Sequence, residues 1–330
     1  MQFIDLAKQK HNVCVVGAGY WGKNHIPTLH ELGSLGGIVE QKKDLLDQIT
    51  EQCPDAKTYR NIDEALGYEE FAGFTVATPA ETHHDIAVQI IKSGKHVLVE
   101  KPFSLNIEDA EHLVTLAKRH DVNLMVGHLM LFHPAIRKIK ELIELGRIGK
   151  LQYIYSNRLN LGQVRTEENV FWSLAPHDVS IFQYLTNSYP TSIIAKGSTF
   201  LQKGIQDSTI TQLKYPNGVE GHIFVSWLHP FKEHRMVVIG SDAMITFEDS
   251  AVDKPLKLYS KKFEFNHGTP EKIDGSIENI DYKQTLPLTE ELQYFTNHLG
   301  GKKPKLCNGK HAIEVIKILV EASNQLNNNE

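Results

Sequence analysis

The sequence of 330 residues is poor in cysteine and has no long apolar run. Its three cysteines, Cys14, Cys53 and Cys307, form no Cys-x-x-Cys pair, which argues against a disulfide framework and against a zinc site. Nowhere do roughly eighteen apolar residues follow one another, and residues 1–10 lack the apolar centre of a signal peptide. We therefore expect a cytoplasmic protein that has no membrane partner and binds no metal.

The sequence also has no excess of basic residues over acidic ones. The 35 lysines and arginines stand against 40 aspartates and glutamates, so the formal net charge is −5 and the isoelectric point lies near 6.4. Proteins that attract nucleic acid over their whole surface carry the opposite balance. We expect no nucleic-acid partner, and any anionic ligand must be bound by a local basic cluster. The length and the 41% of apolar residues favour about two globular domains.

The order of the apolar segments predicts an α/β domain over residues 1–127. Short β-branched runs alternate there with helical periodicities, as in βαβ units around a doubly wound parallel sheet. The runs that read as buried strands are 13–16, 73–77, 96–100 and 123–126. Between two of them, apolar residues recur with helical spacing after Asn106, which can cap a helix.

Residues 128–330 are expected to form an α+β domain with an antiparallel sheet that is open on one face. A helix that ends at Gly146 comes first, and the pattern then changes to alternation with a period of two. The expected strands are 151–160, 234–240, 243–247 and 256–259, with a hairpin turn at 215–218 and two closing helices near 290–299 and 310–326.

A glycine-rich turn joins the first predicted strand to a helix. Gly17, Gly19 and Gly22 form the pattern Gly-x-Gly-x-x-Gly, with Tyr20 and Trp21 inside it. The first glycine permits a tight turn, the second lets a pyrophosphate approach the backbone, and the third lets the helix pack on the sheet. Because the motif follows the first strand of a βαβ series, it predicts a dinucleotide site that includes all five residues. The alternative is that the glycines serve only a tight turn.

An acidic residue, Glu40, ends the second apolar run. A carboxylate at this place can accept hydrogen bonds from the ribose hydroxyls, and it repels a 2′-phosphate. Lys42 and Lys43 follow at once and could pair with a 2′-phosphate instead. The sequence therefore favours NAD over NADP as the cofactor.

Glu100, Lys101 and Pro102 follow the run 96–100 at the edge where open α/β sheets bind ligands. The proline disfavours a helical conformation at Lys101. An ammonium group beside a nicotinamide could orient a substrate hydroxyl or relay its proton. The alternative is a surface cation without a catalytic role.

Several motifs together resemble the glucose-fructose oxidoreductase / inositol dehydrogenase (Gfo/Idh/MocA) family. They are the glycine motif, Thr78-Pro79 with His83 beyond it, the segment 94–102 with Glu-Lys-Pro, and the segment 126–128. The resemblance spans almost the whole chain. It implies an NAD-binding Rossmann domain, a substrate domain that often forms homodimers or homotetramers, and a catalytic lysine, Lys101. It also places Thr78, Pro79, His83 and Glu100 at the cofactor.

The family has a second catalytic position, a histidine that opens a helix in the pattern Asp-x-Gly-x-His. His177 aligns with it, and Ser173 stands where the aspartate would be. A serine cannot stabilise an imidazolium as a carboxylate would, so the partner of His177 stays open; Asp178 is adjacent and is included in the substrate site. Histidine titrates near neutral pH and could accept the hydroxyl proton. The alternative is a capping or buried structural histidine.

Two arginines lie near the expected reaction centre. Arg158 and Asn160 share one face of a predicted strand, and Arg165 follows in the next loop. Guanidinium groups bind phosphate with two hydrogen bonds, so these three residues predict a site for a nucleotide diphosphate. The alternative is that the arginines pair with Glu167 and Glu168.

The segments 19–25, 131–134, 155–162 and 165–169 resemble family members of surface-polysaccharide pathways. The resemblance implies NAD-dependent oxidation at C3 of UDP-N-acetylglucosamine or its uronate, a sugar-nucleotide substrate. Three alternatives are kept: a dehydrogenase or ketoreductase of free sugars or inositols, a glycosidase that retains NAD, and an NAD sensor without activity.

Overall fold

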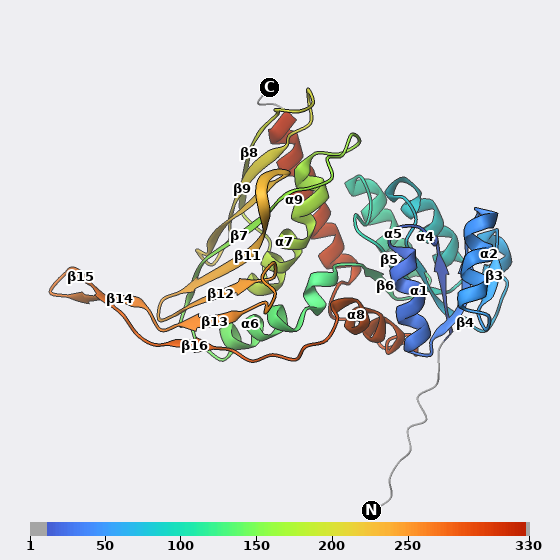
Figure 1. Cartoon of the computed structure of the whole chain (residues 1–330), viewed down its shortest axis with the longest axis horizontal. Helices are drawn as coiled ribbons and strands as arrows, with labels where there is room; N and C mark the ends of the chain where they lie inside the picture. Colours follow the sequence, from blue (N-terminus) through green and yellow to red (C-terminus); the bar gives the residue numbers. More distant parts are fainter. Residues whose placement is uncertain (1–11, 328–330) are drawn as a thin grey trace, which may run out of the picture. The chain divides into compact units, whose positions relative to one another are not determined.

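The computed structural model describes residues 12–327, and the chain divides into two compact units (Figure 1). Unit 1 contains the chain up to Gly127 together with Leu288–Ile313, and unit 2 contains His128–Pro287 together with the chain from Glu314. The sequence pattern predicts a single domain from residue 128 onward. The structure differs, because Leu288–Ile313 packs with the first unit.

Unit 1 is built on six parallel strands in the order β3-β2-β1-β4-β5-β6. The strands are β1 (Asn12–Val16), β2 (Leu35–Val39), β3 (Lys57–Tyr59), β4 (Phe71–Val76), β5 (His96–Val99) and β6 (Leu124–Val126). The helices are α1 (Gly22–Glu31), α2 (Lys43–Gln52), α3 (Ile62–Leu66), α4 (His83–Lys92), α5 (Ile107–Arg119) and α8 (Pro287–Thr296), with a short 3-10 turn, η1 (Ala80–Thr82). The predicted Rossmann sheet is confirmed.

The strand order reverses between β1 and β4, and this reversal positions the candidate cofactor site. The loops that leave the carboxyl ends of these two strands run side by side, and ligands bind open α/β sheets at such a point. Gly17 follows β1 and Thr78 comes after β4. They are in close contact, since a Cβ on Gly17 would lie 2.8 Å from Cγ2 of Thr78.

Helix α8 covers β4 and explains why the late segment joins unit 1. A Cβ on Gly73 would lie 2.7 Å from Cδ2 of Leu299 and 3.0 Å from the ring of Phe295. Asn123, which precedes β6, donates its side-chain amide to the carbonyl oxygen of His298 at 2.8 Å. An apolar contact and a buried hydrogen bond therefore tie the segment to the parallel sheet.

Unit 2 is built on an eight-stranded sheet in the order β16-β13-β12-β11-β7-β10-β9-β8. Its strands are β7 (Leu151–Leu161), β8 (Ser192–Ser198), β9 (Ser208–Lys214), β10 (Glu220–Ser226), β11 (Leu228–Gly240), β12 (Met244–Glu248), β13 (Leu256–Tyr259) and β16 (Ile277–Asn279). Neighbouring strands are antiparallel except for β7 and β10, which are parallel. The expected antiparallel sheet is therefore mixed, because the chain crosses over between β7 and the β8–β10 meander.

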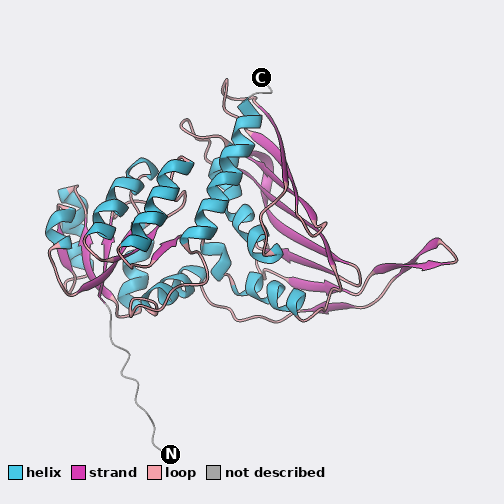
Figure 2. Cartoon of the chain, turned by 180° about the vertical axis from the view of Figure 1, so that it is seen from behind, coloured by secondary structure: helices cyan, strands magenta, loops and turns pink. Residues whose placement is uncertain are grey.

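Helices lie on one side of this sheet (Figure 2). They are α6 (Pro134–Glu144), α7 (Val170–Thr186) and α9 (Gly309–Asn327), preceded by the 3-10 turn η2 (Leu129–Phe132). Within the part of the chain that the structure describes, no helix covers the opposite face. Strand β9 shows the consequence, since Thr211 and Leu213 are buried while Ile210 is 43% exposed. The prediction of a sheet open on one face is confirmed.

A separate two-stranded ribbon extends from unit 2 (Figure 1). It consists of β14 (Lys262–Asn266) and β15 (Thr269–Ile273), which pair with each other and with no other strand in residues 12–327. Phe263 and Phe265 are 62% and 76% exposed. The sequence pattern does not predict this ribbon.

Candidate active site

In the loop between β1 and α1, two glycines have no space for a side chain and the third has free space beside it. A Cβ on Gly22 would overlap the carbonyl oxygen of Gly17, and Gly17 itself has a φ of +89°. A Cβ on Gly19 would meet no atom within 4 Å. Chain packing therefore requires Gly17 and Gly22, whereas Gly19 leaves space at the N-terminus of α1, where backbone N–H groups attract anions. This is the arrangement that a dinucleotide pyrophosphate needs.

The carboxylate of Glu40 lies beside this loop. One oxygen accepts the N–H of Ala18 at 2.9 Å, and the other accepts the N–H of Lys42 at 2.9 Å. Glu40 follows β2, the place from which an acidic side chain reaches the hydroxyls of an adenosine ribose. A 2′-phosphate would bring further negative charge to the same carboxylate. The residues present therefore fit NAD better than NADP.

Two aromatic residues form the outer part of the loop. The side chain of Tyr20 is 76% exposed, and its ring meets Trp21 edge-on at 6.3 Å between ring centres. The ammonium of Lys23 lies 5.4 Å from the centre of the Tyr20 ring. The contact of both aromatic residues with a cofactor stays a prediction.

His83 connects the loops that follow β4 and β5. It is the first residue of α4 and is 1% exposed. Its Nε2 lies 2.9 Å from the carbonyl oxygen of Thr78, and its Nδ1 lies 2.8 Å from that of Pro102. Both partners can only accept, so a neutral ring satisfies one of them and a doubly protonated ring satisfies both. His83 thereby holds the Thr78-Pro79 segment against the segment that carries Lys101.

Lys101 is half-buried at the carboxyl edge of the sheet, after β5. Its backbone N–H donates to Oε2 of Glu100 at 3.1 Å, and Oε1 of Glu100 lies 2.8 Å from Nε2 of His25. The peptide bond between Lys101 and Pro102 is cis. A Cβ on Gly127 would lie 3.0 Å from the Glu100 carboxylate, so the chain packs closely around this group. The main chain of the candidate catalytic lysine is therefore held by a buried carboxylate.

His177 lies within α7, not at its start. The helix begins after Asn169, whose side chain accepts the N–H of Trp172 at 3.1 Å. The expectation of a helix-opening histidine is therefore wrong, since this cap starts the helix earlier. His177 is half-buried and one helical turn beyond Ser173, so the two residues share a face of α7. The backbone oxygen of His177 accepts the hydroxyl of Ser180 at 2.7 Å.

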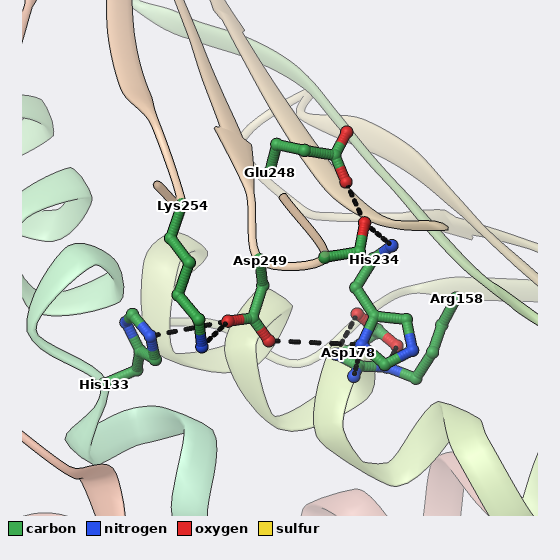
Figure 3. Close-up of polar contacts among 8 residues, drawn as sticks. His133, Arg158, Asp178, His234, Glu248, Asp249 and Lys254 are labelled. Atoms are coloured by element: carbon green, nitrogen blue, oxygen red, sulfur yellow. Dashed lines mark hydrogen bonds and ion pairs between the residues drawn. The ribbon is translucent and has the colours of Figure 1, made fainter. Parts of the chain in front are cut away.

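The residue after His177 is held by Arg158 of β7 (Figure 3). Nε of Arg158 lies 2.7 Å from one oxygen of Asp178, and Nη2 lies 3.2 Å from the other. Arg158 is 8% exposed and Asp178 is 2% exposed. Burial opposes the charged guanidinium, but the charge and hydrogen bonds of Asp178 outweigh it and raise the pKa of Arg158. The ionic partner of Arg158 is thus Asp178, and not Glu167 or Glu168.

The ion pair continues into a network of half-buried polar groups, His234, Asp249 and Lys254. Nδ1 of His234 lies 3.3 Å from Nη1 of Arg158, and Asp249 is paired with Lys254 at 2.8 Å. Burial, together with the charge of Arg158, lowers the pKa of His234 to about 3, so this histidine is neutral near pH 7. Two cations then balance two carboxylates, those of Asp178 and Asp249. Sequence patterns do not indicate this network, because its members come from distant segments.

The second arginine has a different environment. Arg165 lies between β7 and α7, and its side chain is exposed. Its carbonyl oxygen accepts the amide of Gln202 at 2.8 Å. Asn160 is half-buried near the end of β7. Of the two arginines, Arg165 is therefore the one open to solvent, and Arg158 is buried in an ion pair. The contact of Arg165 and Asn160 with a substrate stays a prediction.

His25 is not among the site residues predicted from the sequence, although its position in the helical pattern indicates that it is buried. His25 directly precedes Ile26 and lies four residues before Leu29, on the face of α1 that helical spacing predicts to be buried. A histidine on such a face needs a polar partner. The partner is Glu100, which helical periodicity cannot identify.

Comparison with known proteins identifies the family. Residues 11–128 match the model of the Gfo/Idh/MocA oxidoreductase family, with an NAD-binding Rossmann fold, and residues 136–246 match the model of the Gfo/Idh/MocA C-terminal domain. The chain belongs to the Gfo/Idh/MocA oxidoreductase family. It is an oxidoreductase with an NAD-binding domain, which confirms the predicted enzyme class and cofactor.

Relatives within the family differ in substrate. The chain is 24% identical to the UDP-N-acetylglucosamine 3-dehydrogenase of Acidithiobacillus ferrooxidans over 89% of this chain and 90% of that one. It is 26% identical to the myo-inositol 2-dehydrogenase of Thermotoga maritima over 90% of each. The solved structure of the first enzyme superposes with a TM-score of 0.84 at 22% identity, covering 96% of this chain and 97% of that one. The shared fold is therefore compatible with either kind of alcohol.

Among residues 12–327, no helix is long and apolar enough to cross a membrane. Among the same residues, no group of three or more histidine, cysteine, aspartate and glutamate side chains is placed to hold a metal ion.

We expect Gly19→Ala to weaken NAD binding without destabilising the fold. The added methyl group would meet no atom of the chain but would fill the space at the start of α1. The Kd for NAD should rise about tenfold or more, and Tm should move by less than about 2 °C. Calorimetric titration and thermal unfolding measure both quantities. Gly22→Ala is the control that should lose stability as well, and unchanged NAD affinity in Gly19→Ala would contradict the assignment of this loop.

Arg158→Leu should lower the free energy of unfolding by about 3–5 kcal/mol, because it leaves the Asp178 carboxylate buried without its cation. The double variant Arg158→Leu/Asp178→Leu should lose less than the sum of the two single variants. Urea denaturation measures these differences. Arg165→Ala is the matched control, with an expected change within about 0.5 kcal/mol. Equal effects of Arg158→Leu and Arg165→Ala would show that the buried pair does not stabilise unit 2.

Proposed function

We propose that the protein oxidises the C3 hydroxyl of UDP-N-acetylglucosamine, or of its uronate, to a ketone in the biosynthesis of a surface polysaccharide. The observation that carries the proposal is the similarity to a UDP-N-acetylglucosamine 3-dehydrogenase along 89% of this chain. A substrate with a diphosphate also needs a local cation in a protein of net charge −5, and Arg165 is an exposed guanidinium after β7. A free polyol would need no such group.

The residues of the chain suit the oxidation of an alcohol. NAD, when bound, accepts a hydride from the reacting carbon. The ammonium of Lys101 donates to the oxygen of the substrate hydroxyl and orients it, and His177 accepts the hydroxyl proton as the hydride leaves. The backbone hydrogen bond from Lys101 to Glu100, and the contact of His83 with Pro102, give the lysine a defined starting position.

The two arginines are assigned different roles. Arg165 and Asn160 bind the diphosphate or the carboxylate of the substrate. Arg158 is held by Asp178 and acts through α7, because the ion pair fixes the helical turn that carries His177. Arg165 is therefore needed to bind the substrate, and Arg158 is needed to keep unit 2 folded.

We also propose that copies of the chain assemble as a homodimer or homotetramer through the uncovered face of the large sheet. Tyr155 and His222 stack on this face at 5.1 Å between ring centres, and Ile194 lies in the same row of paired residues. Ile194 is 50% exposed, and Ile210 in the next row is 43% exposed. An apolar sheet face of this kind is commonly covered by a second subunit.

Purified protein supplied with NAD and UDP-N-acetylglucosamine, or its uronate, should form NADH. Coupling to an aminotransferase that removes the ketone draws the reaction forward. Free N-acetylglucosamine and myo-inositol are the control substrates, and Arg165→Ala should raise KM for the sugar nucleotide while the Kd for NAD stays unchanged. Turnover of the free polyols without turnover of either sugar nucleotide would exclude the proposal. Release of a cleaved sugar without net NADH would indicate a glycosidase.

Lys101→Met should leave the affinity for NAD nearly unchanged but lower kcat by about two to four powers of ten, the range for the loss of acid–base assistance. The methionine keeps most of the length of the side chain and removes only the charge. His177→Ala should lower kcat in the same range. Stopped-flow measurement of NADH formation gives kcat, and a Lys101→Met enzyme with wild-type kcat would remove the lysine from the mechanism.

A further inference from the structure

A set of buried ionisable side chains lies beneath the segment that carries Lys101. His25 of α1, Glu100 at the end of β5 and Glu291 of α8 are 0%, 5% and 0% exposed. His25 and Glu100 are in contact at 2.8 Å, and the charge of Glu100 acts on Glu291. One end of α8 lies near the lower end of α1 in Figure 1. All these elements belong to unit 1.

The space between α8 and the sheet is polar as well as buried. Gly73 of β4 faces α8, and Thr75 shares its strand face because side chains alternate along a strand. The hydroxyl of Thr75, both carboxyl oxygens of Glu291 and Nδ1 of His25 are buried and have no hydrogen-bond partner among the residues that the structure describes. A core built only for stability would have apolar side chains here, since buried ionisable groups lower stability. Such groups concentrate at functional sites.

The two carboxyl groups of the set have different surroundings. Burial raises the pKa of Glu291 well above its ordinary value, and the charge of Glu100 raises it further. Both effects favour the protonated, neutral form of the Glu291 carboxyl. Glu100 has two partners: one oxygen accepts the backbone N–H of Lys101 at 3.1 Å, and the other lies 2.8 Å from Nε2 of His25. Of the two carboxyl groups, Glu100 is therefore the one that touches Lys101.

We propose that His25 and Glu291 are positioning residues for Lys101. His25 holds one oxygen of Glu100, so that the second oxygen stays on the Lys101 N–H. Glu291 is buried in the same set, and its shift toward the neutral form avoids a second buried charge next to Glu100. A shift of the Glu100 carboxylate would move the backbone of Lys101 and, with it, the ammonium. Misplacement of a catalytic group by about 1 Å can lower the rate about a hundredfold. This inference rests on the role proposed above for Lys101.

The protonation of Glu291 has a defined effect on stability. The unfolded carboxyl titrates near 4.5, and the folded one titrates at higher pH. Below 4.5 both states are protonated. As the pH rises from there through the folded pKa, the unfolded state loses its proton first, so the free energy of unfolding falls. Among the ionisable groups around Glu291, Glu100 strengthens this effect.

Glu291→Gln should remove this pH dependence, because an amide replaces the neutral acid and has no proton to lose. The fall in Tm between pH 5 and pH 8 should be smaller than in wild type, and the variant should be at least as stable at pH 8. The infrared band of a protonated carboxylic acid should disappear. Glu290→Gln, one residue earlier on α8 and half-buried, is the matched control and should change neither quantity. An unchanged infrared band in Glu291→Gln would overturn the proposal.

His25→Leu removes the donor to Glu100, and His25→Gln restores an N–H of similar reach. His25→Leu should lower kcat about tenfold to a hundredfold, with KM and the Kd for NAD within about threefold of wild type, and His25→Gln should recover most of kcat. The rate at which an amine-reactive reagent labels Lys101, followed by mass spectrometry, should change with kcat. His30→Gln, on the exposed side of α1, is the control.

Wild-type kcat and labelling rate in a folded His25→Leu protein would overturn the proposal, as would a loss that His25→Gln does not recover. The labelling rate and the infrared band need no substrate. A wild-type protein that oxidises no sugar nucleotide therefore counts against the proposed substrate, while these two measurements still decide the role of His25 and Glu291.

Discussion

Buried ionisable side chains that must be paired are the constraint on which both units depend. In unit 1, Glu100 meets His25, and in unit 2, Arg158 meets Asp178. Each pair joins two elements that are far apart in the sequence, and each borders a candidate catalytic residue. Burial of any one of these groups alone would cost several kcal/mol, so the partners restrict each other to a single arrangement. The same restriction fixes the main chain next to the lysine and the helical turn next to the histidine.

The family models and the site geometry support different conclusions about function. The family models establish an NAD-binding oxidoreductase. The open space at Gly19 and the carboxylate of Glu40 suit the pyrophosphate and the adenosine ribose of such a cofactor. The proposed choice of substrate depends on unit 2, where Arg165 is exposed and Arg158 is paired with Asp178.

Local patterns predict much of the fold, and non-local contacts account for the differences. The cap at Asn106 and the helix stop at Gly146 are confirmed, because each depends on a few neighbouring residues. The parallel pairing of β7 with β10 is not predictable in this way, since alternation does not specify which strand lies alongside. In the site, the glycine motif identifies its own position, whereas the partner of Arg158 comes from another element. The packing of α8 on Gly73 joins residues that are far apart in the sequence, and local periodicity cannot predict such a contact.

The division of unit 1 between the two ends of the chain has a consequence for synthesis. The face of β4 that α8 covers is translated early, but Leu288–Ile313 leaves the ribosome only after all of the strands of unit 2. During that interval an apolar surface of the nascent Rossmann sheet has no native cover, a condition that exposes folding intermediates to aggregation. The contacts that complete unit 1 also join distant parts of the chain, such as Gly73 and Leu299, and contacts of such long range slow folding. A chaperone that covered this surface until Leu288–Ile313 is translated would protect the part of unit 1 that the chain order leaves exposed.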